Sequence, residues 1–181
     1  SELIEKGQLA DFRIKCLILK YDESIRQQAR KWDYNSEIDY IVKSEARNTF
    51  IRNLTLSLKG NTLILYQYVE KHGKNLYDNI QSKAGKRKTF FVFGGTDTEI
   101  RESVRSILEN EDDAIVVASY GTFSTGINIR NLHNIIFASP SKSRIRNLQS
   151  IGRGLRKSET KEKATLFDIA DDFRIGKFAN Y

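Results

Sequence analysis

The sequence predicts an α/β fold built on a mainly parallel sheet with helices on both faces. Short apolar runs rich in β-branched residues alternate along the chain with segments of helical periodicity. This alternation is typical of strand–helix–strand crossovers, and strands without a polar face are typical of a sheet covered on both sides. The chain contains one proline, and most of its eleven glycines fall at the expected element boundaries, so no long linker is predicted.

Six segments are predicted to be strands because each is an apolar run of strand length. In chain order they are residues 12–21, 62–69, 88–93, 114–119, 134–138 and 164–169. Ligands of parallel sheets gather at the carboxyl ends of the strands. The loops after Phe93, Ser119 and Ala138 are therefore the first places to look for a functional site.

Helical spacing of apolar residues predicts the intervening helices. Ser36, with Asp39 three residues later, forms a capping box that opens a helix continuing with one gap to Leu58. A second helix contains Leu76 and Ile80, and two more span residues 97–110 and 142–152. We expect one domain over residues 1–181, with 1–58 as a lead-in strand and helices and 60–172 as the core.

Composition excludes several classes of protein. Hydrophobic residues make up 39% of the chain and charged residues 29%, which fits a globular protein and not a disordered one. A single cysteine and two histidines exclude an internal disulfide and a zinc site. No apolar run approaches the length of a membrane span and the N-terminus has no signal-peptide pattern, so we expect an intracellular, cytoplasmic protein without a structural metal.

Three common enzyme motifs are incomplete. Gly85–Lys86 resembles the end of a phosphate-binding loop, but Ile80 occupies the first glycine position and Arg87 the hydroxyl position. The turn at residues 93–96 lacks the third glycine of a dinucleotide-binding loop. Residues 121–126 place Ser124 one position away from a nucleophile elbow. The chain therefore carries no complete nucleotide-binding or hydrolase motif of these kinds.

Positive charge is concentrated in one stretch. The formal net charge is +7, and residues 141–163 contain eight lysines and arginines against Glu159 and Glu162. A smaller basic group consists of Lys83, Lys86, Arg87 and Lys88. Concentrated positive charge favours a phosphate-containing partner, either a nucleotide or a nucleic acid, although a solvated basic face is an equal alternative.

The most informative segment is residues 149–156, which read QSIGRGLR. At 100° per residue, Gln149, Gly152, Arg153 and Arg156 fall on one side of a helix, and Leu148, Ile151 and Leu155 form a separate apolar arc. The leucines would dock the helix while two guanidiniums and an amide face a ligand. Planar, permanently charged guanidiniums suit the charge of a transferring phosphoryl group. The alternative is a basic surface helix that ends at a glycine.

This segment resembles motif VI of superfamily 2 helicases, whose pattern is QxxGRxxR. Residues 118–128 follow a strand and resemble motif V, residues 62–67 resemble the motif IV strand, and Gly94–Gly95 matches a glycine turn of the family. The resemblance spans about residues 60 to 172. It implies the second RecA-like domain of a two-domain motor, with a three-layer fold, because the phosphate loop and acidic box of the first domain are absent from this sequence.

The resemblance implies a role in ATP hydrolysis. Arg153 and Arg156 would reach the γ-phosphate of ATP, which with Mg²⁺ is held mainly by the first domain, and Gln149 would bond in the same cleft. Gly126 would allow close approach of the backbone, and Asn128 would contact the ribose or tie its loop to the arginine helix. This interpretation requires Arg153 and Arg156 to face outward, near the carboxyl edge of the sheet. The domain alone is not expected to hydrolyse ATP.

The resemblance also implies contacts with nucleic acid that do not depend on base sequence. They would come from Gln67 and Tyr68, from the helix start at Gly94, Gly95 and Thr96, and from motif V, where Ser119, Tyr120 or Thr122 stands in place of the family's threonine. Free amides at helix N-termini suit phosphates and read no bases. The expected partners are single-stranded or branched DNA and the N-terminal RecA-like domain of the same protein.

Three functions remain open at this point. The first is the motor domain of an ATP-dependent DNA helicase that acts on branched DNA in recombination, repair or replication. The second is an RNA helicase or a restriction-enzyme motor with the same core. The third is a non-enzymatic module that binds nucleic acid through the basic stretch at residues 141–163.

Overall fold

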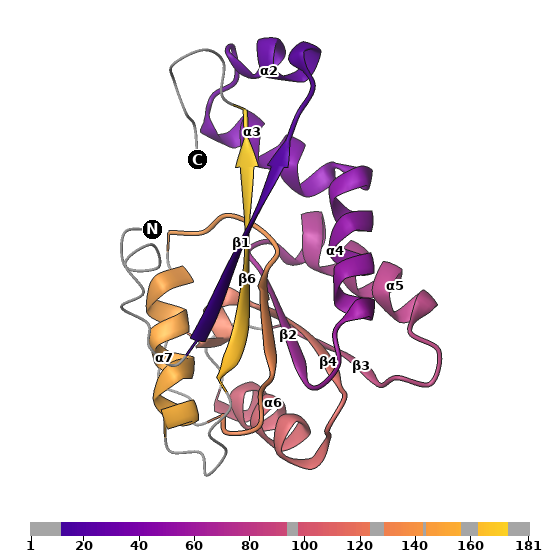
Figure 1. Ribbon diagram of the computed structural model, residues 1–181, viewed down its shortest axis with the longest axis vertical. Coiled ribbons are helices and arrows are strands. Elements are labelled where there is room, and N and C mark those ends of the chain that lie inside the picture. Colours follow the sequence, from indigo (N-terminus) through magenta and orange to yellow (C-terminus); the bar gives the residue numbers. More distant parts are fainter. Residues whose placement is uncertain (1–11, 94–97, 124–128, 143, 157–162, 174–181) are drawn as a thin grey trace.

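Within the described residues, six strands form one parallel sheet in the order β1-β6-β5-β2-β4-β3 (Figure 1). The computed structural model describes residues 12–93, 98–123, 129–142, 144–156 and 163–173. Every pair of neighbouring strands is parallel. All six predicted strands are confirmed, with ends that differ by a few residues. Their bounds are β1 Phe12–Lys20, β2 Thr62–Tyr66, β3 Thr89–Val92, β4 Ile115–Ser119, β5 Asn134–Phe137 and β6 Ala164–Asp172.

Helices cover both faces of the sheet, which confirms the predicted α/β class. On one face lie α4 (Glu45–Ser57) and α5 (Lys74–Lys83), and on the other α6 (Thr98–Asn110) and α7 (Arg144–Arg156). Each pair of helices packs into its own buried cluster because successive residues of the strands point to opposite faces. Thus Leu63 and Leu65 of β2 face α6 and α7, whereas Ile64 and Tyr66 face α4 and α5.

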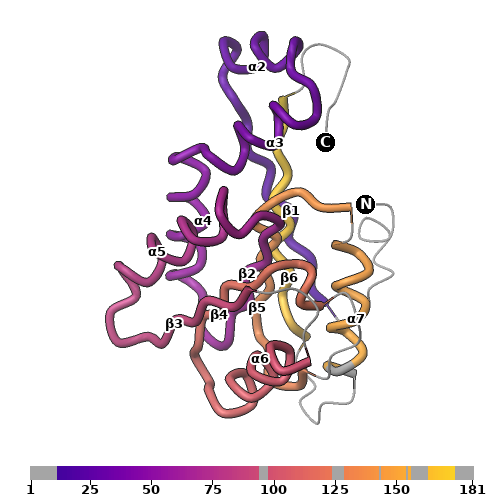
Figure 2. The backbone as a smooth tube through the Cα atoms, turned by 180° about the vertical axis from the view of Figure 1, so that it is seen from behind, coloured from indigo at the N-terminus to yellow at the C-terminus, as the bar shows by residue number. Residues whose placement is uncertain are grey.

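The lead-in segment joins the same sheet at one edge. β1 pairs with β6 in register from Phe12 with Ala164 to Lys20 with Asp172. These two strands extend past the rest of the sheet, and α2 (Glu23–Ala29) and α3 (Tyr34–Lys43) lie beyond their carboxyl ends (Figures 1 and 2). Four aromatic rings pack together there, from Tyr21, Trp32, Tyr40 and Phe173.

The long helix predicted from Ser36 to Leu58 is wrong, because the structure divides it into α3 and α4. Ser44 lies between them in an extended conformation (φ −65°, ψ 113°), and its hydroxyl accepts a hydrogen bond from the Arg47 amide at 3.3 Å. The cap of α3 is Asp33, which accepts from the Ser36 amide at 2.8 Å. A serine that caps a new helix breaks the old one without interrupting the apolar spacing. α2 was not predicted because none of its residues is buried.

Two short turns occupy the connections that follow β2 and β4. β2 ends at Tyr66, three residues earlier than predicted, and a π-helical turn, η1 (Val69–Gly73), leads into α5. A Cβ at Gly73 would lie 2.6 Å from the ring of Tyr66, so this turn packs directly on the buried tyrosine. After β4 comes a 3₁₀ turn, η2 (Tyr120–Phe123).

No helix in the described ranges has both the length and the apolar character needed to cross a membrane.

Candidate functional site

Helix α7 has the two-sided character that its sequence predicts. Leu148 and Ile151 are fully buried against the sheet, and Leu155 packs at the edge of the same cluster. Gln149 and Arg153 are exposed, so the polar side of the helix faces solvent. Gly152 is buried between these groups. The apolar residues therefore fix the orientation of α7, and that orientation keeps Gln149 and Arg153 available to a ligand.

The expected position of the arginine helix relative to the carboxyl edge is wrong. α7 is the crossover between β5 and β6, so it runs back toward the amino ends of the strands (Figure 1). Arg144 lines a cavity at the carboxyl ends together with Asp168 and Asp171. Arg153 lies nine residues farther along the helix, or about 14 Å at 1.5 Å per residue. Arg153 therefore meets the requirement for exposure, but it lies toward the opposite edge of the sheet.

Several predicted site residues fall outside the described residues. These are Gly126 and Asn128 of motif V and the helix start at Gly94, Gly95 and Thr96. The backbone of Arg156 completes α7, while its side chain is not among those described. Their assigned roles stay predictions.

The predicted contacts at Tyr120 and Thr122 are not supported, because both side chains are buried. Tyr120 is 1% exposed, and its hydroxyl donates to the Ser139 carbonyl at 2.7 Å. Thr122 is fully buried, and its Oγ1 lies 3.2 Å from Ser119 Oγ, within hydrogen-bond range. Burial raises the pKa of the Tyr120 hydroxyl above its ordinary value. These groups support the loop after β4 from inside, and Ser119 has only slight exposure.

Gln67 and Tyr68 do lie on the surface at the carboxyl end of β2. Both are exposed, and the Gln67 amide donates to Ser139 Oγ at 2.9 Å, which joins the loops after β2 and β5. The ammonium of Lys71 lies 5.3 Å from the centre of the Tyr68 ring, and it also pairs with Asp39 at 2.9 Å. A groove of about 310 Å³ runs beside these residues, between α3 and the loop at Pro140.

A buried ion pair that no motif predicts stabilises this edge. Arg47 of α4 forms a two-pronged contact with Asp171 of β6, at 2.8 and 3.0 Å, and also donates to the Ala138 carbonyl. Tyr21 donates to the same carboxylate at 2.5 Å. Burial, followed by the charge of Asp171, raises the pKa of the Tyr21 hydroxyl. Arg47 and Asp171 are 124 residues apart, so no local spacing could reveal the pair.

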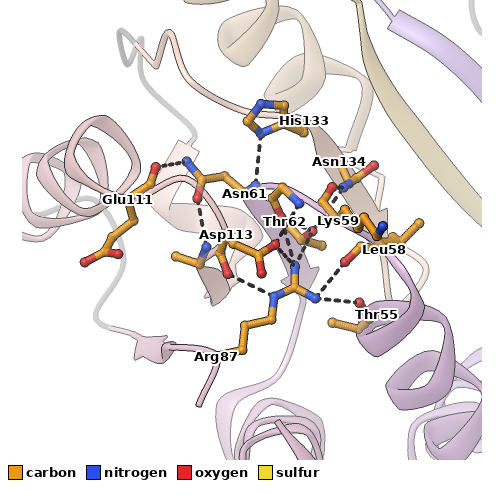
Figure 3. A network of polar contacts seen from close by, with 12 residues as sticks. Thr55, Leu58, Lys59, Asn61, Thr62, Arg87, Glu111, Asp113, His133 and Asn134 are labelled. Atoms are coloured by element: carbon orange, nitrogen blue, oxygen red, sulfur yellow. Dashed lines mark hydrogen bonds and ion pairs between the residues drawn. The ribbon is translucent and has the colours of Figure 1, made fainter. Parts of the chain in front are cut away.

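At the amino edge of the sheet, part of the predicted basic group has a structural role (Figure 3). The guanidinium of Arg87 donates to the carbonyls of Leu58 at 2.7 Å, Gly60 at 2.9 Å and Asp113 at 2.9 Å. Beside it, the side chain of the fully buried Asn61 bonds to four backbone groups, at Leu108, Glu111, Ala114 and Asn131. Arg87 therefore holds loops together and is not available to a phosphate.

Comparison with known proteins matches this architecture to motor proteins. Residues 45–158 match the family model described as the helicase conserved C-terminal domain. The chain is 37% identical over 174 residues to the ATP-dependent DNA helicase uvsW of Enterobacteria phage T4. That match covers 94% of this chain and 34% of the relative, so the chain spans about a third of the relative's length.

Solved structures give the same match. The crystal structure of T4 UvsW superposes with a TM-score of 0.77 at 35% identity, over 95% of this chain and 35% of that one. The E. coli DEAD-box protein SrmB, solved bound to regulator of ribonuclease activity A, superposes with a TM-score of 0.54 at 10% identity, over 88% of this chain and 78% of that one. The second likeness shows the shared RecA-like fold.

Proposed function

Because the chain belongs to the family of helicase conserved C-terminal domains, we propose that it is the second motor domain of an ATP-dependent DNA helicase or translocase. The similarity to a relative named as an ATP-dependent DNA helicase supports DNA as the substrate. We further propose that the intact protein acts on branched DNA in recombination, repair or replication. In the intact protein, an N-terminal RecA-like domain would hold ATP and Mg²⁺.

The observation that carries this proposal is that the polar side of α7 faces outward. Because Arg153 does not lie at the carboxyl edge as predicted, the nucleotide cleft is proposed along the part of α7 nearer the amino ends of the strands. Leu148 and Ile151 are buried, while Gln149 and Arg153 are exposed. Arg156 follows Arg153 by three residues, so its backbone position lies on the same side of the helix. With the Arg156 side chain on that side, the two guanidiniums would form a positively charged wall, and such a wall fits a cleft that a second domain completes.

In this proposal, Arg153 and Arg156 contact the γ-phosphate of ATP across the cleft between the two domains. They stabilise the negative charge that develops on the transferring phosphoryl group, and Gln149 bonds in the same cleft. Gly126 and Asn128 would form the neighbouring part of the nucleotide site. Closure of the cleft on ATP and its opening after hydrolysis would move the two domains relative to each other.

The carboxyl edge of the sheet would hold the nucleic acid. Gln67 and Tyr68 are exposed there, and the predicted contacts at Gly94, Gly95 and Thr96 come after the edge strand β3 in the sequence. Backbone amides at such positions bind phosphates without reading bases. The nucleotide and the nucleic acid would thus occupy different parts of this domain, so domain motion can be transmitted from one to the other.

The test is the hydrolysis of ATP by the intact protein with Arg153→Ala or Arg156→Ala. Arginines of this kind contribute roughly 10³-fold or more to turnover in related phosphoryl-transfer enzymes. We expect each variant to lose DNA-stimulated hydrolysis by that order while ATP binding and the melting temperature stay unchanged. Arg52→Ala is the matched control, because Arg52 lies on α4, on the opposite face of the sheet, and bonds only its neighbour Asn53 among the described residues.

Retained turnover in both arginine variants would contradict the proposed role of α7. Forked DNA, duplex DNA and RNA are compared as stimulators in the same assay. If only RNA stimulates hydrolysis, the result would favour an RNA helicase over a DNA helicase. Binding of nucleic acid without any ATP hydrolysis by the intact protein would favour the non-enzymatic module.

A further inference from the structure

Exposed aromatic side chains gather at the carboxyl edge of the sheet. Among the described residues, the exposed large hydrophobic side chains are Ile18, Tyr34, Tyr68 and Phe93. Tyr34 is 48% and Tyr68 37% exposed, and both line the groove of about 310 Å³ beside Ile38, Gln67, Pro140 and Lys142. We call it the Tyr34–Tyr68 groove. Its volume lies at the lower end of the range for small-ligand sites.

A second, smaller cavity adjoins this groove. It has a volume of about 130 Å³ and shares Tyr34, Ile38 and Pro140 with the groove. Its lining is mostly apolar, and its other walls include Arg144, Asp168 and Ala170. An apolar cavity of about 150 Å³ accommodates one benzene ring. The smaller cavity therefore has nearly the volume required by one aromatic ring.

The smaller cavity is lined by charges of both signs, Asp168 and Arg144, and the groove is lined by Lys142. Asp168 is 6% exposed and forms no hydrogen bond or ion pair with any described residue. The Asp168 carboxylate accepts N–H groups, such as those at the edge of a base. Lys142, at the groove, is exposed and has no ion pair within the described part of the chain. A ligand with a planar N–H-bearing end and an anionic end matches this arrangement.

We propose that the Tyr34–Tyr68 groove binds one unstacked nucleotide of a single-stranded nucleic acid. The base packs on the tyrosine rings with its polar edge toward Asp168, and the phosphate lies at Lys142. This inference rests on the proposed motor function and adds a base contact to its phosphate contacts. Tyr34 lies outside residues 45–158, which match the family model, so the site depends on the lead-in segment of this chain.

Stacking of a base on an aromatic side chain changes affinity by about 5- to 150-fold, and every base has a face that can stack. The site is therefore compatible with binding that is indifferent to sequence. Because a tyrosine ring carries no charge, its loss leaves the salt dependence of binding unchanged, whereas loss of a phosphate contact makes that dependence shallower.

The experiment measures binding of the intact protein to a single-stranded oligonucleotide and to the same strand with abasic sites, by fluorescence anisotropy. We expect the wild-type protein to bind the normal strand at least about 5-fold more tightly. Tyr34→Ala and Tyr68→Ala should lose this difference, and Tyr34→Phe and Tyr68→Phe should retain it. Asp168→Asn should weaken binding of the normal strand only, and Lys142→Ala should lower the salt slope for both strands.

Equal binding of normal and abasic strands by the wild-type protein would overturn the inference. An equal loss of affinity for both strands in the alanine variants would also overturn it. So would alanine variants that have a lower melting temperature but keep the preference for the normal strand. That second result would mean that a protein segment fills the groove. If Tyr34→Ala does not fold, Tyr34→Leu keeps apolar packing without a ring and gives the same comparison. DNA-stimulated ATP hydrolysis is measured in parallel. If it persists while base dependence is absent, only this inference fails; if both are absent, the proposed function fails.

Discussion

At the scale of single residues, His72 is a buried histidine that the fold keeps neutral. It is fully buried, and its Nε2 lies 2.9 Å from Oδ1 of Asn48, whose amide nitrogen donates to the Val42 carbonyl. Nε2 is therefore the donor, and Nδ1 has no hydrogen-bond partner. A second proton would be placed on Nδ1, where it would remain buried and unbonded. Burial, together with the nearby charge of Arg47, lowers the pKa of His72 to about 3.

This shift makes stability depend on pH. Between the unfolded pKa of 6.5 and the folded value of about 3, the unfolded chain binds a proton that the folded protein does not. The free energy of unfolding is therefore highest above pH 6.5 and falls by up to about 1.4 kcal/mol per pH unit below it. Urea denaturation at pH 7.5, 6 and 5 measures this slope. His72→Gln should abolish the change in unfolding free energy between pH 7.5 and 5, whereas His133→Asn should keep it. An unchanged slope in His72→Gln would contradict the role assigned to His72.

At the scale of elements, Arg87 shows how connections at the amino edge are held together. The loop before β2 turns at Gly60, whose φ of +92° favours glycine, and its carbonyls point to the guanidinium. The same group bonds the Asp113 carbonyl just before β4. One side chain thus positions the starts of two neighbouring strands.

We expect Arg87→Lys to destabilise the protein by about 1–3 kcal/mol, because one ammonium cannot replace the fork of donors and leaves partly buried carbonyls without a donor. Urea denaturation at neutral pH measures the loss. Lys86→Ala removes an adjacent exposed charge and should change stability by less than about 0.5 kcal/mol. Equal effects of the two substitutions would show that Arg87 acts only through its charge.

At the scale of the whole molecule, the Arg47–Asp171 pair connects three distant parts of the chain. It links α4 to the carboxyl end of β6, to the loop after β5 through Ala138, and to the end of β1 through Tyr21, the residue that follows this strand. The side chains of both ion-pair partners are almost fully buried, with exposures of 1% and 2%. The pair therefore supports the edge where the Tyr34–Tyr68 groove lies.

Arg47→Met leaves a buried carboxylate without its cation, and we expect a loss of about 3–5 kcal/mol. Asp171→Asn in the same protein removes the unpaired charge, so the double variant should be more stable than the sum of the two single losses predicts. A double-mutant cycle by urea denaturation gives the coupling energy. Additive losses would contradict an ion pair that acts as a unit.

The sequence alone determined the six strands, the helices α5, α6 and α7, and the sides that they bury. Apolar, β-branched runs specify strands buried on both sides, and the spacing of Leu148, Ile151 and Leu155 specifies which side of α7 is buried, because both patterns are local. The QxxGRxxR segment indicated the family that the comparisons show. The single long helix at residues 36–58 was wrong because Ser44 breaks the backbone without breaking the apolar spacing.

Tertiary structure decided what depends on contacts between distant residues. The strand order carries α7 back toward the amino edge and so separates Arg153 from the carboxyl-edge loops. Tyr120 and Thr122, which were predicted to contact nucleic acid, are buried. Because α3 packs beside the loop at Pro140, Tyr34 and Tyr68 line the same groove. Helix and strand patterns arise from neighbours along the chain, whereas grooves and ion pairs arise from segments that meet only when the chain has folded.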